Sequence, residues 1–479
     1  MQKKFVSSLL LLLLLNVLVK PLWIFGIDLT VQNRVGAEAY GLYAAIFSFT
    51  MIFNIVLDLG LTHFNNRSIA QNTDQVSKNF SRLTGLKLLL GFLYLLIAFG
   101  LGYFLNYTSI AFGLLLVLAI NQFLASFILF LRSHLAGLHL FKSDSLLSVL
   151  DKLLMIVACG LLLFTEILST DFTIMHFALA QMGSYVLAAV IGFSMVLRKA
   201  GAFSFHFQIK DYAQNLKDSL PYAVLILLMA LYTRVDSVML QQISGAFENG
   251  VYFQAFRLLD VVNQLGYLFA VLLLPIFSGM FSRKEDVKGL TRLSFSLIYT
   301  GALAIAVASW FSADEIMGAL YNEYSELSTP VFRILIISSL AFGSTYVFGT
   351  LLTARGNLRA LNTVALSGFV LNIILNFILI PVYGAQGAAI ATVFTQFATA
   401  IVQVWLSFRL ARMSFLPKYW VKLALYTSVS ILLSYGLVII DINWMLYLLF
   451  SGAGTLLLAI PFKMLNLPAA IDLVRNRFK

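Results

Sequence analysis

Apolar runs of about 20 residues recur along almost the whole chain of 479 residues. An α-helix of that length crosses the hydrocarbon core of a bilayer, because each residue adds about 1.5 Å. With 60% hydrophobic and 11% charged residues, a water-soluble fold could not bury the apolar surface. We therefore predict an all-α polytopic membrane protein with about 14 transmembrane helices. The predicted spans are 6–27, 40–62, 84–104, 108–130, 145–165, 172–196, 219–241, 250–275, 292–311, 329–352, 360–381, 386–408, 420–440 and 443–462.

Lysine and arginine are distributed unevenly once these runs are treated as spans. Most of the 32 Lys and Arg fall in the N-terminal tail, every second loop and the C-terminal tail, and only Arg34 falls in the opposite loops. The positive-inside rule then places both termini on the cytoplasmic side. The outer loops are short and acidic, beginning with Asp28 and Glu38, and they leave no room for a catalytic domain outside the membrane.

The net charge and the cysteine content exclude other classes of protein. A net charge of +11 would suggest nucleic acid as a partner of a soluble protein. In a membrane protein this excess faces anionic lipid headgroups, so we expect membrane lipids and no nucleic acid as partners. The one cysteine, Cys159, excludes an internal disulfide, and the sequence has no CxxC motif or suitable pair of histidines, so we expect no metal site.

A short internal repeat relates two parts of the chain. Residues 36–43, GAEAYGLY, match residues 245–252, GAFENGVY, as G-A-x-x-x-G-x-Y. Both copies lie in an outer loop that enters an even-numbered span, which predicts parallel repeats of six spans each. We therefore expect a six-helix lobe over 1–200, a second six-helix lobe over 201–412, and two additional helices with a cytoplasmic tail over 413–479.

The same segments carry a family resemblance. Residues 35–60, VGAEAYGLYAAIFSFTMIFNIVLDLG, followed by Arg67, resemble the opening of O-antigen (Wzx-type) flippases. These are polysaccharide biosynthesis proteins of the multidrug/oligosaccharidyl-lipid/polysaccharide (MOP) exporter superfamily. Further matches are 234–236, 245–252, 372–376 and 380–389. The resemblance implies a MATE-like fold, transport without covalent chemistry, an isoprenoid-linked oligosaccharide as substrate, and the polysaccharide polymerase machinery as a partner.

Several cations lie inside predicted spans or at their ends, where an ionisable side chain is costly and commonly lines a pathway. They are Lys20, Lys87, Lys152, Arg234, Arg257 and Arg333. The predicted topology puts Lys20, Arg234, Arg257 and Arg333 in the outer half of the bilayer. The resemblance supplies a matching anion, the pyrophosphate that joins lipid to sugar, and Arg and Lys bind phosphate oxygens well. We expect these four residues to bind the headgroup.

A structural salt-bridge network is the alternative role for these charges. Arg257 and Asp260 are three residues apart on one predicted helix and can neutralise each other. Asp236 can pair with Lys20 or Arg257. Arg333 can extend to the outer interface.

Other charged residues are interpreted as structural. Asp58, at the inner end of the second span, is expected to brace the loop that holds Arg67. Lys87, Lys152 and Asp151 lie near predicted span ends and are interpreted as interfacial residues.

Proline and asparagine residues indicate how the spans bend and pack. Pro21, Pro221 and Pro275 are expected to kink the first, seventh and eighth spans. Asn372 and Asn376, four residues apart on one helix face, are interpreted as hydrogen-bonding residues that hold a neighbouring helix.

We expect a flippase in the bacterial cytoplasmic membrane that moves a lipid-pyrophosphate-linked oligosaccharide to the outer leaflet by alternating access. No cofactor is expected, and coupling to Na⁺ or H⁺ stays open. The nearest alternative is a cation-coupled multidrug antiporter, which would usually need an acidic binding site. A peptidoglycan lipid-precursor flippase is a further alternative, and the short outer loops disfavour a membrane glycan polymerase or ligase.

Overall fold

A computed structural model describes residues 18–62, 76–105, 109–138, 140–165, 171–201, 212–411, 415–440 and 442–464, together with Leu15, Asn65 and Ile69. Across these ranges the secondary structure is helical and contains no strand. The chain forms two compact units, Met1–Gln241 and Gln242–Lys479, and each has its own apolar core. The predicted lobe boundary at residue 200 adjoins 202–211, which lie outside the described residues, so the predicted division stays a prediction.

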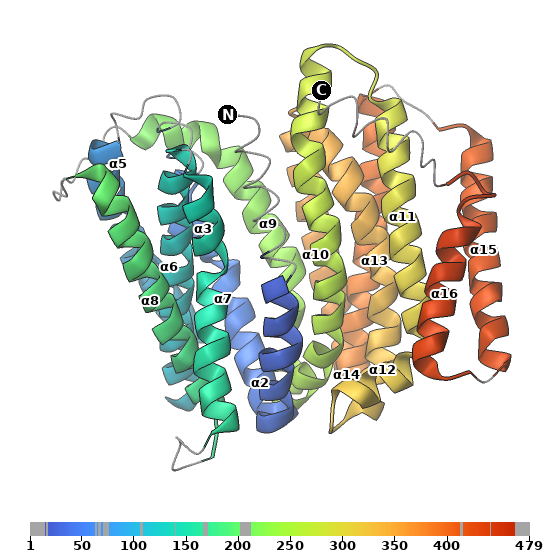
Figure 1. The fold of residues 1–479 in the computed structure, drawn as a ribbon, viewed down its shortest axis with the longest axis horizontal. Helices are drawn as coiled ribbons and strands as arrows, with labels where there is room; N and C mark the ends of the chain where they lie inside the picture. The colour runs from blue at the N-terminus through green and yellow to red at the C-terminus, as the bar shows by residue number, and fades with distance from the viewer. Residues whose placement is uncertain are drawn as a thin grey trace. The chain divides into compact units, whose positions relative to one another are not determined.

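The first unit is a helical bundle (Figure 1). Its elements are the π-helix η1 (Leu22–Asp28), α2 (Leu29–Ile52), α3 (Asn54–Asp58), α5 (Val76–Phe104), α6 (Ser109–Gly137), α7 (Phe141–Phe164), α8 (Ile174–Ala200) and α9 (Tyr212–Ser244). Phe80 of α5, Phe130 of α6 and Leu147 of α7 are buried in one shared core. Helices suit a membrane because they satisfy every backbone hydrogen bond within the segment.

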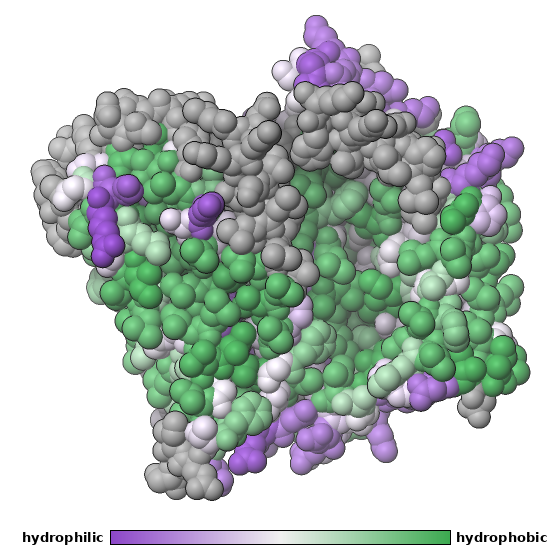
Figure 2. Space-filling view, viewed as in Figure 1, coloured by the Kyte–Doolittle hydropathy of each residue, from purple (hydrophilic) through white to green (hydrophobic). Residues whose placement is uncertain are grey.

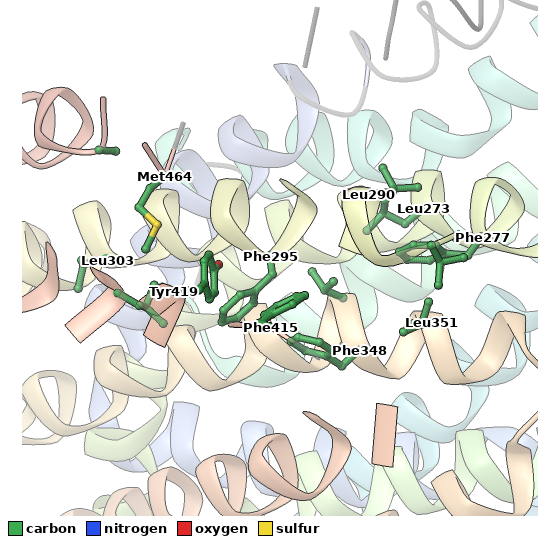
Figure 3. Close-up of a cluster of buried hydrophobic side chains, with 14 of the residues drawn as sticks. Leu273, Phe277, Leu290, Phe295, Leu303, Phe348, Leu351, Phe415, Tyr419 and Met464 are labelled. Carbon is green, nitrogen blue, oxygen red and sulfur yellow. The ribbon is translucent and has the colours of Figure 1, made fainter. Parts of the chain in front are cut away.

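The second unit contains the remaining helices. They are α10 (Ala246–Ser282), α11 (Lys288–Phe311), α12 (Ala313–Leu320), α13 (Ser325–Ala354), α14 (Leu358–Leu410), α15 (Pro417–Ile439) and α16 (Trp444–Leu458). The core is rich in aromatic rings, and Figure 3 shows Phe295, Phe348, Phe415 and Tyr419 close together. The last two helices, α15 and α16, pack against each other and against α11, so the C-terminal addition is built onto this unit.

Ten described helical segments are long and apolar enough to cross a membrane. Two of them, Leu18–Ile52 and Leu358–Leu410, break their helical backbone at Gly36 and Gly384 and therefore each correspond to two predicted spans. Together with α9 and the shorter α16, the described helices correspond to the predicted spans, of which the first is described from Leu18 onward. In the view of Figure 2, apolar side chains cover the helix flanks and hydrophilic ones gather towards helix ends. These features confirm the all-α polytopic fold class.

The two copies of the repeat have the same backbone conformation at their first glycine. Gly36 has φ 80° and ψ 168°, and Gly245 has φ 92° and ψ 175°. Side chains with a Cβ rarely adopt this combination, so glycine permits the break at both positions.

The last tyrosine of each copy also makes an equivalent contact. Tyr43 hydrogen-bonds through its hydroxyl to Gln181 of α8, at 2.8–3.2 Å, and Tyr252 does so to Thr392 of α14, at 3.3 Å. In each unit, the span that begins after the glycine is therefore hydrogen-bonded to the last of the six predicted spans of its repeat. The pairing supports the predicted parallel repeat.

The prolines expected to kink helices lie within helical segments. Pro21 directly precedes η1 with helical backbone angles, φ −62° and ψ −40°, and the π-helical turn that follows is itself a local departure from α-helical geometry. Pro221 and Pro275 lie within α9 and α10, and their side chains are outside the described part of the structure. Kinks at these three positions stay predictions.

Candidate functional site

Lys20 enters the first unit one helical turn before an aromatic cluster. Its side chain is half-buried. Trp23, three residues later, is 6% exposed and stacks on Phe177 of α8 with ring centroids 5.8 Å apart. Lys20 precedes this cluster along the chain, and its charge interacts with those of Lys152 and Asp151.

Lys152 of α7 contacts the same ring. Its Nζ lies 5.7 Å from the ring centroid of Trp23 and 5.2 Å from that of Tyr185, and it donates a hydrogen bond of 3.2 Å to the Tyr185 hydroxyl. Lys20 and Lys152 are close enough for their charges to interact. Lys20, just before η1, and Lys152 of α7 therefore lie near each other within the first unit.

The interfacial interpretation of Lys152 is wrong. The helix α7 begins at Phe141, before the predicted start of the span, so Lys152 is near the middle of its 24 residues. Eleven residues of helix separate it from the start, which is about 17 Å. The apolar run alone did not reveal this, because the polar turn at 142–145 belongs to the helix.

One carboxylate accompanies the two lysines. Asp151 Oδ2 lies 3.2 Å from Lys152 Nζ. The nearby Arg132 is already paired with Asp144 at 2.7 Å. The charge of Asp151 also attracts Lys20. We call Lys20, Lys152, Asp151, Trp23 and Tyr185 the two-lysine site, and its local net charge is positive.

Asp28 is a second carboxylate of the first unit, and its prediction as a loop residue is wrong. It is 2% exposed and accepts hydrogen bonds from the Tyr40 hydroxyl at 2.9 Å and from Gln32 Nε2 at 3.4 Å. The helix continues past the predicted span end as far as Gly36, which carries Asp28 inside the bundle. Nothing in the local composition distinguishes Asp28 from the acidic residues of the loops.

The other expected headgroup residues are divided between the units. Arg234 of α9 is half-buried and lies two residues before the buried Asp236, whereas Arg257 and Asp260 are half-buried on α10. Each of these four takes part in at least one hydrogen bond, ring contact or electrostatic interaction. Their gathering into one binding cavity stays a prediction.

Arg333 of α13 has its charge compensated locally. Its Nη2 lies 2.5 Å from Asp314 Oδ2, and its Nε donates a hydrogen bond of 3.2 Å to the carbonyl of Trp310. The guanidinium also lies 5.7 Å from the Trp310 ring centroid. These contacts fit the alternative in which Arg333 extends towards the interface.

Asp58 and Lys87 form an ion pair at 3.1 Å between α3 and α5. Lys87 is fully buried and also donates a hydrogen bond of 2.8 Å to Ser126 of α6. The interfacial interpretation of Lys87 is therefore wrong, because α5 begins at Val76 and carries Lys87 into the bundle. Lys87 of α5 thus joins Asp58 of α3 to Ser126 of α6, while Arg67 lies outside the described residues.

Asn372 and Asn376 of α14 are 1% and 0% exposed. Asn376 Nδ2 donates a hydrogen bond of 3.0 Å to Asn372 Oδ1, so the two amides support each other along one helix face. Among the described residues, no group of three His, Cys, Asp or Glu side chains is placed to hold a metal ion.

Two solved structures show the same fold. The Lipid II flippase MurJ in an inward closed conformation has a TM-score of 0.69 and 16% sequence identity, covering 94% of this chain and 99% of that chain. A multidrug resistance MATE family transporter of the MOP superfamily, in an inward-facing conformation, has a TM-score of 0.65 and 16% identity, covering 82% and 94%. The expected MATE-like fold is confirmed.

Two relatives are similar along most of their length. An uncharacterized membrane protein of Methanocaldococcus jannaschii is 23% identical over 400 residues, which is 79% of this chain and 92% of the relative. A protein of Shigella dysenteriae, whose name proposes O-antigen transport, is 22% identical over 381 residues, which is 77% and 92%.

The family model for polysaccharide biosynthesis proteins matches residues 5–281, more than half of the chain. This match confirms the resemblance seen in the sequence. The two structural neighbours are a flippase and a transporter by name. The chain therefore belongs to the polysaccharide biosynthesis protein family and is a multi-pass membrane protein.

Proposed function

We propose that the protein moves an isoprenoid lipid with a pyrophosphate-linked oligosaccharide from the cytoplasmic to the outer leaflet by alternating access. The observation that carries this proposal is the two-lysine site, a positively charged site about halfway along a membrane-length helix. Membership of the polysaccharide biosynthesis family supports a glycan as the cargo. No bond in the cargo needs to form or break.

The chemistry of the two-lysine site suits a diphosphate. Lys20 and Lys152 lie near one carboxylate, Asp151, so the two lysines carry a net positive charge that can attract an anion. Charges attract more strongly in a medium of low dielectric constant than in water. A diphosphate offers two adjacent anionic groups, and two ammonium groups from neighbouring helices can each contact one of them.

The direction and setting of transport are part of the proposal. We place the protein in the bacterial cytoplasmic membrane with both termini inside, following the charge bias of its loops. An inside-negative potential would then favour outward movement of an anionic headgroup by about 2.3 kcal/mol per charge per 100 mV. Na⁺ or H⁺ as coupling ion and the polymerase machinery as partner also remain proposals.

The remaining predicted residues take supporting roles in this proposal. Arg234 and Arg257 are proposed as further headgroup contacts, with Asp236 and Asp260 as their counter-charges. Arg333 is omitted from this set, because Asp314 already compensates its charge.

Deletion of the gene tests the function. The deleted host is complemented with wild type, Lys20→Met, Lys152→Met or the control Lys142→Met, which changes an exposed lysine at the start of α7. Lipid-linked oligosaccharide and surface glycan are then measured together with protein abundance. We expect wild type and Lys142→Met to restore surface glycan, and the other two variants to accumulate the lipid-linked form.

The trapped sugar identifies the cargo and distinguishes an oligosaccharide from a peptidoglycan precursor. Unchanged glycan pools after deletion, together with altered sensitivity to cationic toxins, would contradict the proposal and support a multidrug antiporter. Normal surface glycan from both Lys20→Met and Lys152→Met at wild-type abundance would exclude the two-lysine site as the headgroup site.

A further inference from the structure

Asp151 is a carboxylate directly beside Lys152 of the two-lysine site. It precedes Lys152 in α7, and its Oδ2 lies 3.2 Å from Lys152 Nζ. Because the two residues are neighbours in one helix, no movement of another element can separate them. Any anion that reaches Lys152 therefore competes with Asp151.

We propose that Asp151 is a competing carboxylate that weakens headgroup binding at Lys152 and so permits release of the cargo. Lys152 exchanges the carboxylate for the headgroup when cargo binds and returns to the carboxylate when cargo leaves. This role rests on the proposed function, because it assumes an anionic cargo at the two-lysine site.

Lys152 does not need Asp151 to hold its position. The Tyr185 hydroxyl accepts a hydrogen bond from Nζ at 3.2 Å, and the rings of Tyr185 and Trp23 lie 5.2 and 5.7 Å from Nζ. Such ring contacts stabilise a cation whether or not an anion is present. What Asp151 adds to this arrangement is its negative charge.

The other charges near the two-lysine site determine how much the carboxylate of Asp151 matters. Arg132 and Asp144 form their own pair, although Arg132 also repels Lys20. Asp28 lies further along the bundle, near Cys159, where it is hydrogen-bonded to Tyr40. Removing the charge of Asp151 would therefore leave both lysines of the site uncompensated.

A transporter must bind its cargo strongly enough to load it and weakly enough to release it. Two uncompensated lysines at membrane depth would hold a diphosphate tightly, because the low dielectric constant strengthens the attraction. When release limits turnover, tighter binding slows transport. A carboxylate that competes for one lysine lowers the affinity without removing the cation that selects the anion.

Equilibrium binding to the full-length protein in nanodiscs tests the inference. The probes are an isoprenoid diphosphate, the matching uncharged isoprenoid alcohol and inorganic pyrophosphate. For the isoprenoid diphosphate, we expect Asp151→Asn to lower the Kd about tenfold and Lys152→Met to raise it about tenfold, the size of effect that one charge can exert. The Kd for the alcohol should stay unchanged in both variants.

Matched controls separate charge from folding. Asp171→Asn removes an exposed carboxylate before α8 and should change no Kd. Tyr185→Phe removes the hydroxyl that orients Lys152 but leaves the charges intact, so it should change the Kd for the diphosphate less than Lys152→Met does. Lys152→Arg keeps the cation and should retain most of the binding.

The outcomes separate the inference from the proposed function. If wild type binds the isoprenoid diphosphate no better than the alcohol, the proposed function fails. If it binds inorganic pyrophosphate as tightly as the lipid, a free diphosphate replaces the lipid as ligand. If Lys152→Met weakens binding while Asp151→Asn leaves it unchanged or weaker, the headgroup site stands and the competing role of Asp151 is overturned.

Discussion

The ion pair of the buried Lys87 with Asp58 gives the most quantitative prediction for stability. Lys87→Met removes the cation and keeps most of the volume of the side chain. It leaves Asp58 with its hydrogen bonds from Thr62 and leaves the Ser126 hydroxyl without its donor. The variant should therefore be less stable than wild type, although it leaves every apolar side chain of the protein unchanged.

The magnitude follows from how exposed the stranded carboxylate is. Breaking a fully buried ion pair costs about 3–5 kcal/mol. The Lys87 side chain is 0% exposed but that of Asp58 is 27% exposed, so solvation of the carboxylate offsets part of the loss. We expect the free energy of unfolding to fall by about 2 kcal/mol, which lowers the Tm by about 4 °C or more for a unit of this size.

The assay is thermal unfolding of purified protein in one detergent, followed by the fraction that remains monodisperse. Asp58→Asn combined with Lys87→Met removes both charges, so the double variant should recover about half of the lost Tm. Lys142→Met, which changes an exposed lysine, is the control. A Tm for Lys87→Met within about 1 °C of wild type, or a double variant less stable than the single one, would refute this reasoning.

Three further variants test other parts of the structure. Gly36→Ala forces a residue with a Cβ into positive φ and should lower the free energy of unfolding by about 1–2 kcal/mol. The control is Gly100→Ala, where the added methyl group meets open space, and it should not lower the Tm. Equal Tm values for the two variants would contradict a strained backbone at Gly36. Glu248→Ala removes the carboxylate that accepts a hydrogen bond of 2.8 Å from the backbone amide of Ala385. The free energy of unfolding should fall by about 1 kcal/mol, and an unchanged Tm would exclude a capping role for Glu248. Arg333→Met should leave surface glycan normal in the complementation assay, because α12 already compensates that charge; loss of glycan at normal abundance would return Arg333 to the headgroup set.

The spans could be predicted from the sequence because the hydrophobicity of a segment is a property of its local composition. The repeat was also visible locally, since Gly36 and Gly245 stand at the same place in a short motif, and the structure gives them the same backbone conformation. What the motif could not predict is the partner of each tyrosine, because Gln181 and Thr392 lie far along the chain.

The depth of individual charges was harder to predict. The apolar runs predict Lys87 and Lys152 near span ends, because polar residues close to them interrupt these runs, yet both helices extend through those residues. Asp28 was assigned to a loop for the same reason. A polar residue inside a helix and one at its end look alike in composition, and only packing against Ser126, Tyr185 or Tyr40 distinguishes them.

The most direct test of the central claim is a sidedness measurement in proteoliposomes. A lipid-pyrophosphate-linked oligosaccharide is loaded into vesicles with wild type, the double variant Lys20→Met/Lys152→Met or the control Lys142→Met, and its exposure to an impermeant sugar-modifying enzyme is followed over time. We predict that wild type and Lys142→Met expose the protected fraction and that the double variant, equally well inserted, does not. Equal exposure by all three proteins would contradict a headgroup site at the two lysines, and no exposure above protein-free vesicles would contradict flipping of this cargo.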